Sequence, residues 1–115
     1  MSCGNAIVTA PVSATSGIAL TAANSVNQTV NLTANGTSAV TVIATGGPVT
    51  MAPAATTTSG IGTITYTAGT DVTLGSLSTG GGVNVSAGGS VLSAAGSGTN
   101  VTAGANSTLQ ALNGV

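Results

Sequence analysis

The chain has 115 residues and a formal net charge of −1, because it contains no Lys, Arg or His and a single acidic residue, Asp71. Soluble domains normally carry about a quarter charged residues, so the polar surface of this chain must be built from Ser, Thr, Asn and Gly. Such a surface meets no electrostatic repulsion from copies of itself. The composition therefore argues against a catalyst and favours a scaffold or assembly protein.

Short runs of alternating apolar and polar residues are the strongest pattern along the chain, and Thr and Val favour β-strands. Strands are predicted at Ile18–Leu20, Val30–Leu32, Val40–Val42, Val49–Met51, Ile64–Tyr66, Val72–Leu74 and Val83–Val85. Turn-forming residues separate them, as at Asn35-Gly36, Ser59-Gly60 and Gly88-Gly89. The sequence therefore predicts an all-β chain.

The spacing of these runs indicates how the strands are arranged. Strands begin at residues 30, 40 and 49, and taking alternate later anchors gives a period of about 20 residues, as from Val72 to Val91. This period predicts one parallel β-solenoid over residues 1–115, with rungs of about 20 residues, either within a longer chain or as a polymer subunit. The segment 50–61 does not follow this period and is expected to form a longer loop or an enlarged rung. An antiparallel β-sandwich is the alternative fold, although it normally has an aromatic core and this chain has only Tyr66.

The segment AGTDVTLGSLSTGGGVNVSAGGSVLSAAG, at residues 68–96, resembles the repeats of filamentous haemagglutinin-type exoproteins, as does SGIALTAANSV earlier in the chain. These are large bacterial surface adhesins, many of them secreted through an outer-membrane partner. The resemblance implies a right-handed parallel β-helix and an extracellular or cell-surface location. The near absence of charge departs from the family, and no N-terminal secretion domain is identifiable, which leaves the route of export open.

The inventory of reactive side chains predicts neither an enzyme nor a cofactor or metal site. General acid–base chemistry has only Asp71, Tyr66 and Cys3 to draw on, and a Ser or Thr nucleophile would find no His or Lys to activate it. Asp71 is expected to hydrogen-bond backbone amides in a turn. Cys3 has no partner for an internal disulfide. A chain without Lys or Arg is not expected to bind nucleic acid, and no apolar stretch is long enough for a transmembrane helix.

Two surface features remain as candidate sites. Six sequons are possible glycosylation sites, although Asn and Thr on alternating strands also produce such matches by chance: Asn27, Asn31, Asn35, Asn84, Asn100 and Asn106. Thr63, Thr65 and Thr67 would place three hydroxyls on one strand face, and Thr41, Thr73 and Thr102 are candidates to continue such columns. Flat threonine arrays of this kind are used by some ice-binding proteins, whereas the simpler explanation is that Thr is a good strand former.

These observations predict a structural, non-catalytic segment or subunit of an extracellular fibre, sheath or adhesin stalk that self-associates by β-solenoid stacking. The alternative is an adhesin segment whose outer face binds glycans or ice. Sugar recognition normally uses exposed aromatic side chains, and Tyr66 is the only one in the chain. A functional amyloid with in-register stacking is a third possibility.

Overall fold

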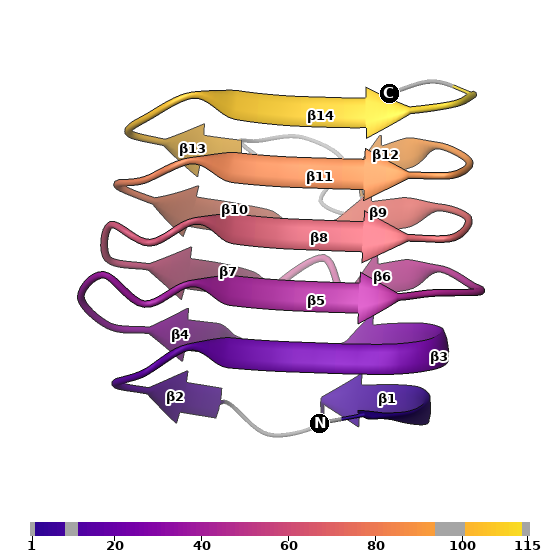
Figure 1. The fold of residues 1–115 in the computed structure, drawn as a ribbon, viewed down its shortest axis with the longest axis horizontal. Helices are drawn as coiled ribbons and strands as arrows, with labels where there is room; N and C mark the ends of the chain where they lie inside the picture. Colours follow the sequence, from indigo (N-terminus) through magenta and orange to yellow (C-terminus); the bar gives the residue numbers. More distant parts are fainter. Residues whose placement is uncertain (1, 9–11, 94–100, 114–115) are drawn as a thin grey trace.

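The chain winds into a β-solenoid of about four turns, with rungs of about 22 residues, in a computed structural model that describes residues 2–8, 12–93 and 101–113 (Figure 1). Its strands are β1 (Ser2–Val8), β2 (Val12–Ala14), β3 (Ile18–Gln28), β4 (Leu32–Ala34), β5 (Val40–Ala44), β6 (Val49–Met51), β7 (Thr56–Ser59), β8 (Ile64–Ala68), β9 (Val72–Leu74), β10 (Ser76–Thr79), β11 (Val83–Ala87), β12 (Val91–Ser93), β13 (Val101–Ala103) and β14 (Ser107–Ala111). The predicted all-β solenoid is confirmed, with slightly longer rungs than expected.

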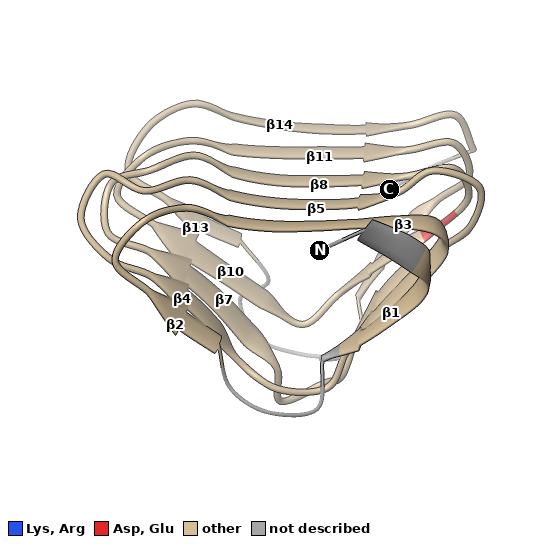
Figure 2. Ribbon diagram, turned by 60° about the horizontal axis from the view of Figure 1, so that its bottom comes forward, with Lys and Arg blue, Asp and Glu red and all other residues tan. Residues whose placement is uncertain are grey.

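Each full turn contributes one strand to each of three faces, which enclose a narrow interior (Figure 2). Face one contains the first half of β3, then β5, β8, β11 and β14. Face two contains β1, the second half of β3, β6, β9 and β12. Face three contains β2, β4, β7, β10 and β13. Because β3 continues around the corner between faces one and two, these two faces form one hydrogen-bonded sheet.

Every strand pairing among the described residues is parallel, which excludes the antiparallel sandwich. Parallel pairing brings equivalent residues of successive rungs into columns. One inward column of face one contains only alanine, because it lies at the corner where the chain turns towards face two: Ala22, Ala44, Ala68, Ala87 and Ala111. Larger aliphatic residues fill another inward column, which contains Val26, Val49, Val72 and Val91 on face two.

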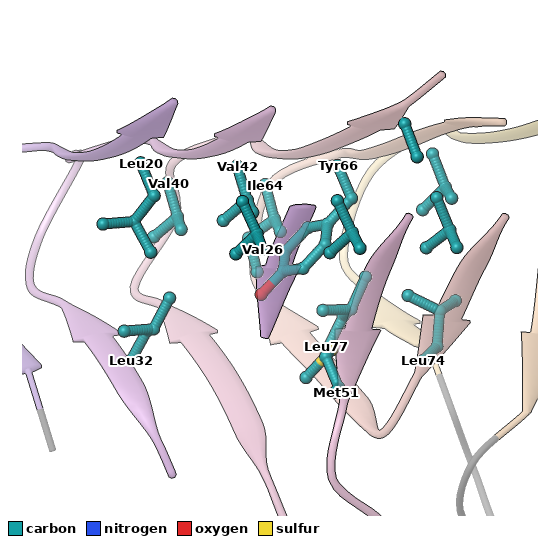
Figure 3. Packing of buried hydrophobic residues seen from close by; sticks show 14 of the residues in the cluster. Leu20, Val26, Leu32, Val40, Val42, Met51, Ile64, Tyr66, Leu74 and Leu77 are labelled. Carbon is teal, nitrogen blue, oxygen red and sulfur yellow. The ribbon is translucent and has the colours of Figure 1, made fainter. Parts of the chain in front are cut away.

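The core is a single stack of these columns (Figure 3). Its largest fully buried side chain is Tyr66, which projects from β8 into the interior near Val42 and Ile64 (Figure 3). The alternation of buried and half-buried residues in β5 and β8 follows the period of two that the sequence shows. This alternation is why the predicted strand starts at Val40, Val49, Ile64, Val72 and Val83 are all correct.

Two strands, β7 and β10, do not show this alternation of apolar and polar residues. The segment 50–61 contains β7, with the sequence TTTS, and β10 has the sequence SLST. Their inward positions include Thr57, Ser59 and Thr79, so apolar alternation does not reveal them. The expected longer loop is therefore wrong for residues 56–59. The rung is enlarged, because the step from Leu32 to Thr57 is longer than the step from Thr57 to Leu77 on the same face.

Candidate functional site

The outer surface that the described residues form is almost uncharged. Asp71 is the one acidic residue of the chain, and Figure 2 shows it as a single red segment near a corner, with no basic residue anywhere. Its Oδ1 accepts a hydrogen bond from the backbone N–H of Ser90 on the next rung, at 2.8 Å. The predicted hydrogen bond of Asp71 with a backbone amide is present, but the amide belongs to Ser90 of the neighbouring rung and not to the local turn after Gly69-Thr70.

Face three carries an unbroken outward column of hydroxyl groups, one on each of its strands. We call it the hydroxyl column; its members are Ser13, Thr33, Thr58, Ser78 and Thr102. The register of four successive strand pairings fixes these residues side by side. A second pair of outward hydroxyls, Thr56 and Ser76, lies two residues before Thr58 and Ser78. Neighbouring strands are about 4.8 Å apart, so the hydroxyls form a regular array.

The predicted threonine ladder lies elsewhere and is less regular. Thr63 is exposed just before β8, and Thr65 and Thr67 point outward from β8 on face one. The Thr65 column does include Thr41, as expected, but it continues into Ala19 and Asn84. The Thr67 column is interrupted by Ile43.

The other two threonines that were candidates for these columns belong to different faces. Thr73 pairs with Thr50 on face two, and Thr102 pairs with Ser78 on face three. The expectation that they continue the face-one columns is wrong, because each rung places three strands on three faces. Two members of the hydroxyl column occur in a short motif with Ser or Thr at alternate positions, Thr56-x-Thr58 and Ser76-x-Ser78, but Thr63-x-Thr65 has the same motif on face one, so the motif alone does not identify the column.

The sequon asparagines are dispersed over the surface. Asn27, Asn31, Asn35, Asn84 and Asn106 are exposed, and Asn100 lies outside the described residues. Asn31 already has a structural role, because its Oδ1 accepts a hydrogen bond from the N–H of Thr56 at 2.9 Å. The structure brings no two of the five described asparagines into one outward column, so they do not form an asparagine ladder. Their glycosylation stays a prediction.

A buried polar cluster of Gln28, Thr57 and Tyr66 was not anticipated from the sequence. Each residue comes from a different face and a different rung, and each replaces an aliphatic residue in its inward column. The Tyr66 hydroxyl donates to Gln28 Oε1 at 2.5 Å, and Gln28 Nε2 donates to Thr57 Oγ1 at 3.0 Å. Gln28 Nε2 also donates to the Val30 carbonyl at 3.0 Å. No buried side-chain N or O among the described residues lacks a hydrogen-bond partner.

Burial of Tyr66 has two consequences for function. Desolvation raises the pKa of its hydroxyl well above the usual value, against the smaller lowering effect of the hydrogen bond with Thr57. The ring is fully buried, so it cannot serve as an exposed platform for stacking on a sugar. The only aromatic residue of the chain therefore acts in the core.

A shallow hollow of about 690 Å³ lies at the corner after face one, near the last strand. It is lined by Ala68, Ser86, Ala87, Gly88, Leu109, Gln110, Ala111 and Leu112. The lining contains no titratable side chain. Within the described part of the chain, no three His, Cys, Asp or Glu residues are grouped as metal ligands would be, and no helix is long and apolar enough to cross a membrane.

The two axial edges of the solenoid also differ from its middle. The upper edge consists of β12, β13 and β14, and the lower edge consists of β1, β2 and the first half of β3 (Figure 1). Inward residues at the upper edge, such as Val101, Leu109 and Ala111, are only partly buried, whereas Leu77, Val85 and Ala87 one rung below are buried. Another rung would complete their burial.

Comparison with known proteins found no family model, no curated protein and no solved structure that matches this chain.

Proposed function

We propose that the chain is a structural, non-catalytic segment or subunit of an extracellular fibre, sheath or adhesin stalk. The observation that carries this proposal is the set of columns that run in register from the lower edge to the upper edge, beneath an almost uncharged surface. Such a body extends along its axis by adding rungs, either from the same chain or from another copy. The extracellular location rests on the resemblance of residues 68–96 to the exoprotein repeats.

The mechanical strength of the proposed fibre comes from the backbone hydrogen bonds between successive rungs. Each rung is hydrogen-bonded to its neighbours on three faces, and side-chain bonds at the corners add cross-links between rungs. Ser59 Oγ donates to the carbonyl of Ser38 at 2.7 Å, and Thr79 Oγ1 donates to the carbonyl of Gly62 at 2.6 Å. A pull along the axis is therefore resisted by many parallel hydrogen bonds that must break together.

Electron microscopy of the purified chain, with measurement of mass per unit length, tests this proposal. In a stacked solenoid, one chain of 10.5 kDa spans its whole set of rungs. In an in-register amyloid, each layer of about 4.8 Å contains one chain, so a solenoid filament has roughly one quarter to one fifth of the amyloid's mass per unit length. Filaments with the lower value support the proposal, and the higher value favours functional amyloid. A chain that stays monomeric at all concentrations contradicts the role as a self-assembling subunit.

A second candidate function is favoured by the hydroxyl column. A rigid, neutral array of regularly spaced hydroxyls, each with one donor and two acceptor positions, fits a ligand surface that is itself periodic and uncharged. Ordered water at an ice surface has these properties. Recognition of glycans is less well supported, because the burial of Tyr66 leaves no aromatic platform on the outside. Partition of the protein into slowly growing ice tests this candidate.

A further inference from the structure

The two edges of the solenoid have the same arrangement of strands. Each face has five strand segments among the described residues, from β1, β2 and the first half of β3 at the lower edge to β12, β13 and β14 at the upper edge. If a second copy is moved along the axis, its β1 lies over β12, its β2 over β13 and its β3 over β14. All these strands would then run in parallel, as they do within the chain.

Several inward residues at the two edges match in identity. Four columns start at the lower edge and finish at the upper edge with the same residue type. These pairs are Leu20 and Leu109, Ala22 and Ala111, Val12 and Val101, and Ala14 and Ala103. In the middle rungs three of these columns contain other residues, such as Tyr66 and Thr57, whereas the Ala22 column is alanine throughout. A stacked copy would therefore place these four edge residues over side chains of their own size, whereas Ile18 would lie over Ser107 and Ala6 over Val91.

The outward column of face two independently indicates that copies stack head to tail. It runs from Ile7 through Asn27, Thr50 and Thr73 to Leu92. Its two end residues are large and apolar, and they are exposed by 62% for Ile7 and 48% for Leu92, whereas the residues between them are polar. Exposed aliphatic side chains at both ends of one column become neighbours when copies stack head to tail, which lowers the exposure of both to water.

We propose that a second copy of this chain docks on the upper edge by its lower edge, so that Leu92 of one copy packs against Ile7 of the next. This inference rests on the proposed fibre function and specifies its axial contact. The interface is heterologous, because the upper edge of one copy meets the lower edge of the next, and repetition of such a contact without closure generates an open filament.

The start of β1 controls access to this contact. Ser2 and Cys3 pair with Thr21 and Ala22 at the lower edge of face one. Gln110 belongs to the same column as Thr21, and Ala111 belongs to the same column as Ala22. In the stack, Gln110 and Ala111 of the neighbouring copy would therefore pair with Thr21 and Ala22, the residues that Ser2 and Cys3 occupy. Residues 2–3 must therefore leave the ladder before β14 of the neighbour pairs fully. Deletion of residues 2–4 is expected to accelerate assembly.

A disulfide trap tests the contact directly. The double variant Ile7→Cys with Leu92→Cys, in a Cys3→Ser background, places one thiol at each edge. Paired residues on neighbouring parallel strands have Cα atoms about 4.8 Å apart, within the range that a disulfide spans. Mild oxidation should convert most of the protein into a ladder of covalent dimers, trimers and higher multimers on a non-reducing gel. The matched control, Asn27→Cys with Leu92→Cys, has its first thiol one rung inside the lower edge and should give at most dimers.

The outcomes separate this inference from the function on which it rests. Circular dichroism first establishes that each variant has the β-sheet spectrum of the parent. Filaments without a covalent ladder would show that the chain assembles through another surface, which overturns the head-to-tail contact and leaves the fibre function intact. Absence of both filaments and ladder overturns both proposals. Slower assembly after deletion of residues 2–4 would contradict the proposed competition at the lower edge.

Discussion

The Tyr66 hydroxyl donates a hydrogen bond of 2.5 Å to Gln28 Oε1, although the two residues are 38 positions apart in the sequence. Tyr66 belongs to β8 on face one, and Gln28 ends β3 on face two. Thr57, on face three, completes the cluster. A buried polar contact that joins three faces can form in one register only, so it opposes slippage of the rungs past one another.

Substitution of Tyr66 by Phe tests the energetic value of this cluster. The substitution keeps the ring but leaves buried polar atoms of Gln28 and Thr57 with fewer partners, which is expected to lower the free energy of unfolding by about 1–3 kcal/mol. Urea denaturation followed by circular dichroism measures this change. The triple variant Gln28→Met, Thr57→Val, Tyr66→Phe removes all three polar groups together and should recover much of the loss. If the triple variant is less stable than Tyr66→Phe alone, this account of the cluster is wrong.

The raised pKa of Tyr66 predicts a specific pH dependence of stability. An unfolded tyrosine loses its proton near pH 10, whereas the folded, buried Tyr66 retains its proton to higher pH. Above pH 10 the folded state therefore binds more protons than the unfolded state, and the free energy of unfolding falls with rising pH by up to about 1.4 kcal/mol per unit.

Unfolding curves between pH 8 and 12 measure this dependence. The chain contains no Lys or Arg and only one tyrosine, so few other groups contribute in that range. A Cys3→Ser background removes the titration of the thiol. The Tyr66→Phe variant should lose the slope above pH 10, and persistence of the same slope in that variant would refute the assignment to Tyr66.

Gly62 is predicted to be intolerant of any side chain. A Cβ at this position would overlap the carbonyl oxygen of Ser38 on the neighbouring rung. The N–H of Gly62 also donates to Ser59 Oγ at 3.0 Å, which holds the turn in place. Gly62→Ala is expected to cost about 1–3 kcal/mol through local displacement of the turn, measured as a shift in the thermal unfolding midpoint. Gly4→Ala is the control, because its Cβ would meet only Asn24 Nδ2 at 3.9 Å. Equal stabilities of the two variants would contradict the overlap.

The hydroxyl column predicts a difference between two faces if the chain binds ice. Thr58→Tyr places a large side chain on face three, whereas Thr65→Tyr places the same side chain on face one. Tyr is a good strand former, so both variants should fold. The first should reduce the affinity for ice by about tenfold and the second should leave it unchanged, measured by the fraction of protein incorporated into growing ice. Equal losses in both variants would exclude face three as the binding face.

The sequence by itself determined that the chain is all-β, favoured a parallel β-solenoid over an antiparallel sandwich, and located the starts of strands such as β5 and β8. Val40 and Val42, or Ile64 and Tyr66, alternate with polar residues because one side of each strand is buried, and this local alternation is visible without a structure. The composition also determined that the surface is almost uncharged. The strands β7 and β10 were not predicted from the sequence, because their inward residues Thr57, Ser59 and Thr79 are polar and are buried with their hydroxyls hydrogen-bonded.

Only the tertiary structure decided which strands are neighbours. The rungs differ in length, so the position of a residue along the chain does not predict its column, and Thr102 lies beside Ser78 and not in the ladder of Thr65. The hydroxyl column, the Gln28–Thr57–Tyr66 cluster and the matching edges all depend on this register. Register is fixed by contacts between residues about one turn apart, which satisfy backbone and buried polar groups together, and a local sequence pattern does not contain that information.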